Sequence, residues 1–296
     1  MLALCSIALV LSVAADEHYS IKKIVNFGDS TSDVGNGAAV ITKNNGPQIP
    51  SDAYYKGRFS NGPTYIENVA KELGAQLHSY SVGGATTSDA LLQGWLGGKF
   101  GEPLRSNGDI IKVPGVDTQV KKYLSEPEPL DKNSILYTIW SGANDETDSK
   151  LQSSSLTASD FADAQYDLWV ALAKAGAVNI MAVVPPPRSA FSLEYGLRMQ
   201  TNAVVFSVEH WHVKFGLYEL PALFAGLLLS PSHYGITHKL TEYCCESCFN
   251  GLPPTGNATI CAKPDEYLAW DVVGHPTAHT HQIIAQDALK FIKAKY

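Results

Sequence analysis

Short apolar runs alternate with amphipathic stretches along this chain. The runs with the length and composition of buried strands are 24–27, 76–82, 135–140, 178–184 and 212–217. Helical periodicity covers 65–73, which Gly74 ends, and 160–175, which Gly176 ends. A last helix is expected to begin at Pro276, since proline suits the first helical position. This alternation predicts an α/β protein whose parallel sheet is covered by helices on both faces.

Polar and glycine residues follow the first three predicted strands. Ser30, Gly84 and Asn144 each stand just after one of them. Because ligands of open parallel sheets bind beyond the carboxyl ends of the strands, we expect these residues to converge at that edge. The Gly-, Pro- and polar-rich segments 44–55 and 92–115 are predicted to be loops at the same edge that form the substrate walls.

Four short segments carry residue types that ester cleavage needs. They are Gly28-Asp29-Ser30, Gly83-Gly84-Ala85-Thr86, Gly142-Ala143-Asn144-Asp145, and Asp271 with His275-Pro276-Thr277. Ser30 is the candidate nucleophile, His275 the base and Asp271 the carboxylate that orients it. The Ser30 N–H, the Gly84 N–H and the Asn144 amide are the candidate donors to an oxyanion.

Each of these residues also has a structural interpretation. Ser30 could cap a helix, Gly84 could be a turn glycine, and Asn144 could bind its own loop backbone. Asp29 and Asp145 are expected to be structural. The chain has no Gly-x-Ser-x-Gly pattern around Ser30, so the nucleophile elbow of α/β-hydrolases is absent.

The four segments resemble the blocks of the GDSL esterases and lipases of the SGNH hydrolase superfamily, which carry Ser, Gly, Asn and His in this order. The resemblance runs from about Ile24 to the C-terminus, and residues 56–62, 80–85 and 267–271 are similar to secreted plant and fungal members. It implies a flavodoxin-like three-layer sandwich with a five-stranded parallel sheet. It also supports the roles given to Gly84 and Asn144.

The chain departs from the family pattern between Asp271 and His275. The family places two residues there, whereas this chain has three, Val272, Val273 and Gly274. Glycine adopts backbone conformations that other residues avoid, so a bulge at Gly274 is expected to absorb the extra residue and preserve the contact. If it does not, a dyad of Ser30 and His275 remains.

Length and charge limit the class of protein. With 296 residues and 45% hydrophobic content, the chain is predicted to form one hydrolase domain over residues 16–296. Residues 1–15 are interpreted as a secretory signal peptide, too short to span a bilayer; a buried N-terminal strand is the alternative. The net charge of −7 argues against a nucleic-acid partner. We expect secretion and no stable membrane insertion.

Four cysteines gather in one short segment: Cys244, Cys245, Cys248 and Cys261. Their number favours two disulfides over a zinc site, and the sequence leaves the pairing open. Asn257 lies in the only glycosylation sequon of the chain. A metal site at His275, His279 and His281 is disfavoured because no Glu stands between them, and His281 is interpreted as a packing or hydrogen-bonding residue. No metal or cofactor is expected.

The sequence therefore predicts a secreted carboxylic ester hydrolase that acts through an acyl-Ser30 intermediate. Small acyl esters, such as acetyl groups on polysaccharides, are the first substrate class, and lipid or phospholipid acyl esters are the second. The alternative is a non-catalytic secreted binding module. The aromatic residues that could stack on sugars or merely pack are Tyr54, Tyr55, Phe59, Trp95 and Trp140. The residues that could form an apolar lip for acyl chains are Leu91, Leu92, Trp95 and Leu96.

Overall fold

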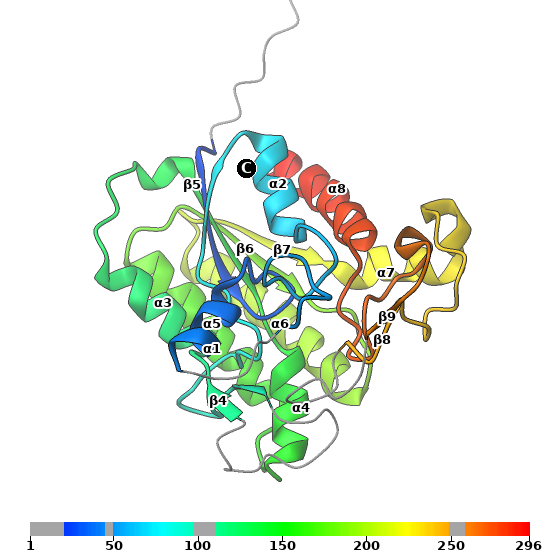
Figure 1. Cartoon of the computed structure of the whole chain (residues 1–296). Helices are drawn as coiled ribbons and strands as arrows, with labels where there is room; N and C mark the ends of the chain where they lie inside the picture. The colour runs from blue at the N-terminus through cyan, green and yellow to red at the C-terminus, as the bar shows by residue number, and fades with distance from the viewer. Residues whose placement is uncertain (1–20, 45–49, 98–109, 249–257) are drawn as a thin grey trace, which may run out of the picture.

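The centre of the fold is a five-stranded parallel sheet. The computed structural model describes residues 21–44, 50–97, 110–248 and 258–296. The strands are β1 (Lys23–Gly28), β2 (Gln76–Ser79), β5 (Ile135–Trp140), β6 (Asn179–Val184) and β7 (Lys214–Glu219). They pair in the order β2-β1-β5-β6-β7, which is the flavodoxin-like order (Figure 1). All four pairings are parallel, and Lys23 of β1 aligns with Gln76 on one side and Ile135 on the other.

The three inner strands are buried along their whole length, whereas the edge strand β2 alternates between exposed and half-buried positions and the edge strand β7 is only partly buried. This difference explains the continuous apolar runs of β1, β5 and β6, because each has helices on both faces. The predicted strands are confirmed, with shifted ends. The last begins at Lys214 rather than His212, because Val213 N–H bonds the His210 carbonyl and closes a turn.

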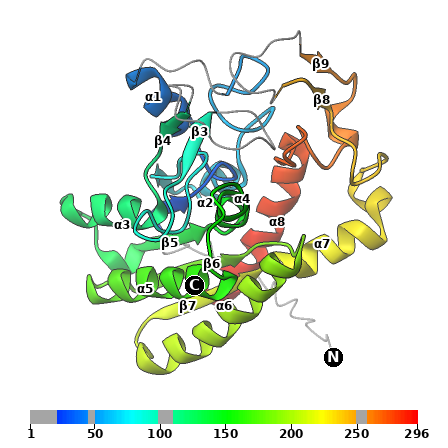
Figure 2. The ribbon, with the colours of Figure 1, turned by 90° about the horizontal axis from the view of Figure 1, so that it is seen from below.

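Helices cover both faces of the sheet and complete three layers (Figures 1 and 2). One face packs against α2 (Tyr65–Leu73), α7 (Leu220–Leu229) and α8 (Ala278–Lys295). The other packs against α3 (Val116–Ser125), α5 (Ala158–Lys174) and α6 (Ala190–Glu209). The fully buried residues include Tyr65 and Ile284 in the layer of α2, α7 and α8, and Trp169, Phe161 and Phe206 in the layer of α3, α5 and α6.

Local sequence signals set several helix ends. Helix α2 begins at a capping box of Thr64 and Glu67 and ends at Gly74, which adopts the left-handed conformation with φ +62°. The predicted start of the last helix at Pro276 is wrong. Pro276 instead forms an antiparallel bridge with Ala269, and Thr277 caps α8 by accepting a hydrogen bond from the Thr280 N–H.

The remaining elements are short. They are α1 (Asn36–Lys43), β3 (Trp95–Gly97), β4 (Ile110–Lys112), α4 (Ala143–Leu151), β8 (Cys245–Glu246), β9 (Thr259–Ile260) and 3-10 turns at Lys132–Ser134, Pro231–Tyr234 and Pro264–Glu266. The segment 92–115 is thus not wholly a loop, because β3 and β4 form an antiparallel pair. Residues 1–15 and Asn257 lie outside the described residues. In the described ranges, every helix is too short or too polar to cross a bilayer.

Candidate active site

The turn that follows β1 presents Ser30. Gly28 ends the strand, and a Cβ there would lie 2.4 Å from the Trp140 carbonyl oxygen, so only glycine allows β1 and β5 to approach this closely. Asp29 stabilises the turn, since its Oδ1 accepts hydrogen bonds from the Thr31 N–H and hydroxyl. This is the structural role expected of Asp29.

Ser30, His275 and Asp271 form one chain of hydrogen bonds. His275 Nε2 lies 2.9 Å from Ser30 Oγ, and His275 Nδ1 lies 2.6 Å from Asp271 Oδ2. The three side chains are buried, with exposed fractions of 9% for Ser30, 7% for His275 and 1% for Asp271. The structure therefore brings together the three residues that the sequence proposed as nucleophile, base and orienting carboxylate, and the extra residue before His275 does not break the contact.

The loop from Asp271 to His275 shows how the extra residue is accommodated. Asp271 Oδ1 accepts the backbone N–H groups of Val273, Gly274 and His275 at 3.0, 3.1 and 3.2 Å. Gly274 adopts φ +91°, a conformation that favours glycine. The loop thus closes as a tight turn around its own carboxylate and leaves Asp271 Oδ2 facing the His275 ring.

The sequence did not indicate a further partner of Asp271. The Tyr54 hydroxyl donates to Asp271 Oδ2 at 2.6 Å. Burial alone would raise the pKa of Asp271, but the charge of His275 and the hydrogen bonds from His275 and Tyr54 hold it below its ordinary value. Burial and the neighbouring Asp271 carboxylate raise the pKa of Tyr54, so this phenol remains a donor. Asp271 is therefore an ionised carboxylate when it faces His275.

The three candidate oxyanion donors lie in adjacent segments. Asn144, in the first turn of α4, donates from Nδ2 to the Ala85 carbonyl at 2.9 Å, which ties α4 to the Gly84 segment. Gly84 has φ +78° and packs against the Trp95 carbonyl so closely that no Cβ would fit. Within the described ranges, the backbone N–H groups of Ser30 and Gly84 have no hydrogen-bond acceptor. Both groups are free to bind an oxyanion.

A cavity of about 400 Å³ opens over Ser30 and His275. We call it the catalytic pocket. Its walls come from the Ser30 turn, the end of β5, α4, the segment after β6, α6 and the loop from Asp271 to His275, which we call the catalytic loop. They include Trp140, Lys150, Arg188 and Tyr195. The predicted walls are wrong for the described residues of 44–55 and 92–115, none of which lines the pocket; residues 45–49 and 98–109 lie outside the described part.

Most of the aromatic and leucine candidates serve the core. Tyr54, Phe59, Leu92 and Leu96 are buried; Phe59 packs its ring 5.2 Å from that of His275. Trp140 alone of these candidates lines the catalytic pocket among the residues that the structure describes. The four buried side chains that do not line this pocket therefore support the site, whereas Trp140 can contact a substrate.

Arg188 is a pocket residue that the sequence did not single out. Its guanidinium group lies beside Gly274, and in the described part of the chain it has no hydrogen-bond or ion-pair partner. Desolvation lowers the pKa of Arg188, while the charges of Asp29, Glu146 and Asp271 act in the opposite sense. The only sequence signal is its place after Pro185-Pro186-Pro187, at the carboxyl end of β6.

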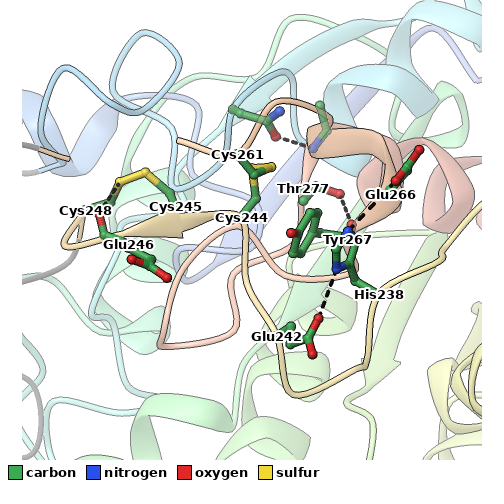
Figure 3. The surroundings of a disulfide bond; sticks show 12 residues. His238, Glu242, Cys244, Cys245, Glu246, Cys248, Cys261, Glu266, Tyr267 and Thr277 are labelled. Atoms are coloured by element: carbon green, nitrogen blue, oxygen red, sulfur yellow. Dashed lines mark hydrogen bonds and ion pairs between the residues drawn. A yellow bond between two sulfur atoms is a disulfide. The ribbon is translucent and has the colours of Figure 1, made fainter. Parts of the chain in front are cut away.

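The cysteine segment contacts the start of the catalytic loop, and Figure 3 shows the cysteine side chains of this segment. The two disulfides pair Cys244 with Cys261 and Cys245 with Cys248, which resolves the pairing that the sequence left open. The Cys245 N–H donates to the Trp270 carbonyl at 2.7 Å, directly before Asp271. Tyr54 and Trp270 pack against the same cysteines, so the donor to Asp271 and the start of its loop share one small apolar cluster.

The three clustered histidines have separate partners. His279 Nε2 faces the Tyr234 carbonyl at 2.7 Å, and His281 Nδ1 accepts the Tyr65 N–H at 3.1 Å. Burial lowers the pKa of His281 to about 3, so its ring is neutral. His281 is thus the packing and hydrogen-bonding residue that the sequence predicted. Over the described ranges, no three His, Cys, Asp or Glu side chains are placed to hold a metal ion.

This fold and this site define the class of the protein as a serine ester hydrolase of the SGNH type. The chain belongs to the GDSL-like lipase/acylhydrolase family, whose model matches residues 24–288. The resemblance that the four sequence segments carried is therefore confirmed.

Two curated relatives are similar over nearly the whole chain. The thermolabile hemolysin of Vibrio parahaemolyticus is 27% identical over 94% of this chain, which spans 65% of the hemolysin's length. The phosphatidylcholine-sterol acyltransferase of Aeromonas hydrophila is 25% identical over 99% of this chain and 97% of its own length.

Solved structures with the same fold are more distant. An active-site mutant of a family two carbohydrate esterase from Clostridium thermocellum has a TM-score of 0.51 at 15% identity, and covers 93% of this chain and 64% of its own. A second structure of such an esterase, in complex with cellohexaose, has a TM-score of 0.50 at 16% identity, with the same coverage. At these identities the likeness concerns the fold alone.

Proposed function

We propose that this protein hydrolyses carboxylic esters through an acyl-Ser30 intermediate. The observation that carries the proposal is the continuous hydrogen-bond chain from Ser30 Oγ through His275 to Asp271. His275 Nε2 takes the hydroxyl proton as Ser30 Oγ bonds to the carbonyl carbon. The same nitrogen then gives that proton to the departing alcohol, and a water molecule, activated in the same way, releases the acid. The buried carboxylate of Asp271 stabilises the imidazolium in both steps.

The free N–H groups of Ser30 and Gly84, with the amide of Asn144, would bind the oxyanion. Negative charge develops on the former carbonyl oxygen when Ser30 attacks, and fixed donors stabilise it without reorganising at that moment. All of these groups belong to the chain itself, so the proposed reaction needs no cofactor.

Labelling with a fluorophosphonate tests the proposal against the non-catalytic binding module, because only an activated serine reacts. We expect wild type to be labelled once and Ser30→Ala not at all. Ser32→Ala is the matched control: Ser32 lies in the same turn and bonds Ser81 Oγ at 2.9 Å, away from His275. Labelling of folded Ser30→Ala, or none of wild type, would show that the site is not catalytic.

Two classes of ester are candidate substrates. The first candidate remains the acetyl ester of a polysaccharide that the sequence analysis proposed. The second candidate is a lipid acyl ester. The similarity to a phosphatidylcholine-sterol acyltransferase along 97% of that protein's length supports it. Turnover of acetyl xylan and of phosphatidylcholine vesicles, each compared with Ser30→Ala, separates the two classes.

We also propose that the protein acts outside the cell. The two disulfides support this, because such bonds persist in oxidising compartments. Expression of the whole chain in a eukaryotic host should yield an extracellular protein that begins near residue 16. Retention of residues 1–15 in an intracellular product would contradict the proposal.

A further inference from the structure

A second cavity, of about 580 Å³, lies on the other side of the catalytic loop. We call it the α7 pocket, because α7 forms one wall and the segments 240–243 and 268–276 form the opposite one. It shares Pro186, Arg188 and Gly274 with the catalytic pocket. The two cavities are therefore neighbours that meet across the loop carrying His275.

The walls of the α7 pocket are largely apolar. Its apolar lining includes Pro221, Phe224, Ala225, Leu228, Leu240 and Val272. Several polar groups that line it already have partners. Asp271 binds His275, Glu242 lies 3.0 Å from His238 Nδ1, and the Thr280 hydroxyl donates to the Leu268 carbonyl at 2.8 Å. Such walls suit a hydrocarbon better than a sugar, whose hydroxyls need free hydrogen-bonding groups.

Exposed apolar side chains adjoin the α7 pocket. Leu228 is 62% exposed and its neighbour Leu229 is 84% exposed at the end of α7, and Val272 of the catalytic loop is 41% exposed. Exposed apolar side chains that continue a cavity mark a place where apolar ligands enter.

Gly274 stands at the junction of the two pockets. A Cβ on Gly274 would lie 3.3 Å from the Arg188 guanidinium, so a side chain there would crowd the place where the two cavities adjoin. The glycine that accommodates the extra residue of the loop thus also leaves space beside Arg188, where the two cavities adjoin.

We propose that the α7 pocket binds the acyl chain of the ester, with the carbonyl carbon at Ser30 and the chain passing Gly274 and Arg188. The alcohol part then lies in the catalytic pocket against the polar side chains of α4. This assignment rests on the proposed ester hydrolysis, and it makes a chain of medium length a better substrate than acetyl. Each methylene that enters an apolar pocket strengthens binding by up to about fourfold.

The substitution Ala225→Trp tests the pocket, because Ala225 lies at the surface of α7 and lines the cavity. We expect kcat/KM for p-nitrophenyl octanoate to fall at least about tenfold, while that for p-nitrophenyl acetate stays within about twofold of wild type. Ala222→Trp is the matched control: Ala222 is also exposed on α7 and lines neither cavity, so both values should persist. An unchanged octanoate value in Ala225→Trp, or an equal loss for both esters, overturns the proposal.

Binding of octanoate to the Ser30→Ala protein separates this proposal from the proposed function. The affinity for octanoate is measured by calorimetry on the Ser30→Ala protein with and without each tryptophan substitution. We expect Ala225→Trp to weaken this affinity about tenfold and Ala222→Trp to leave it unchanged. If Ser30→Ala retained esterase activity, the proposed mechanism would be wrong, but the octanoate measurement would still show whether the α7 pocket binds an acyl chain. No binding at millimolar octanoate, or equal binding in both tryptophan variants, rejects the acyl-chain site.

Discussion

Replacing Asp271 with asparagine tests how the catalytic loop controls His275. The carboxylate accepts five hydrogen bonds: three backbone N–H groups at Oδ1, and His275 Nδ1 and the Tyr54 hydroxyl at Oδ2. Asparagine offers one oxygen and one NH2 group. The oxygen can satisfy either the three N–H groups or the histidine, but not both.

The number of hydrogen-bond donors on each side decides how the side-chain amide introduced by Asp271→Asn is oriented. If the NH2 group faced the three backbone N–H groups, those of Val273 and His275 would lose this acceptor, at a cost of about 1–3 kcal/mol apiece, whereas the Gly274 N–H would keep its bond to the Asp271 backbone carbonyl. The amide oxygen therefore stays with the backbone, and the NH2 group points at His275 Nδ1. That nitrogen must then accept, so Nε2 carries the proton and cannot take one from Ser30. A wrong tautomer of this kind reduces turnover by about 10⁴-fold in a chymotrypsin-like triad.

We therefore expect Asp271→Asn to lower kcat for p-nitrophenyl acetate by about 10³–10⁴-fold, with KM little changed. The matched control is Tyr54→Phe, which removes one donor to Oδ2 and leaves the His275 bond in place; its loss should stay below about tenfold. Thermal unfolding of each variant checks that the fold persists. A loss below about tenfold in Asp271→Asn, beside an inactive His275→Ala, would show that a dyad of Ser30 and His275 performs the reaction.

Three further predictions concern the surrounding structure. Asn144→Ala should lower kcat about 10²–10³-fold by removing an oxyanion donor, and an unchanged kcat would reject that role. Burial and the charge of Asp145 raise the pKa of Asp148 from 3.8 to about 7, so between these pH values the folded protein holds a proton that the unfolded chain has lost. The free energy of unfolding should therefore fall from pH 4 to 7, and an equally steep fall in Asp148→Asn would refute this role of Asp148. Reducing the Cys244–Cys261 bond should lower activity before the core unfolds, and simultaneous loss of both would contradict it.

The sheet and the principal site residues follow from local features of the sequence. The strands β1, β5 and β6 are buried on both faces, so each appears as an apolar run that needs no knowledge of its neighbours. Ser30 lies two residues after the end of β1, and Asn144 lies four residues after the end of β5. The general rule that sites form beyond the carboxyl ends of parallel strands then brings them to one edge without any knowledge of the loops.

What the sequence did not reveal depends on contacts between distant segments. The Tyr54 hydroxyl reaches Asp271 across 217 residues of chain, and no local pattern marks that pair. The pairing of four cysteines within one segment depends on how the chain folds back, because three pairings fit the same spacing. The α7 pocket has the same origin, since its walls come from α7, the segment after β6 and the catalytic loop.

The loop that carries His275 is anchored to other segments at both ends, and this contributes to its tolerance of an added residue. On one side, the Cys245 N–H binds the Trp270 carbonyl. On the other, Ser60 Oγ donates to the Pro276 carbonyl at 2.8 Å, and the Asn61 side-chain oxygen accepts the Ala278 N–H at 2.6 Å. With both ends fixed, the residues between need only turn around the Asp271 carboxylate, and Gly274 supplies the one unusual backbone conformation. The positions of Asp271 and His275 therefore depend on these anchors together with the turn around the carboxylate, and not on the number of residues alone.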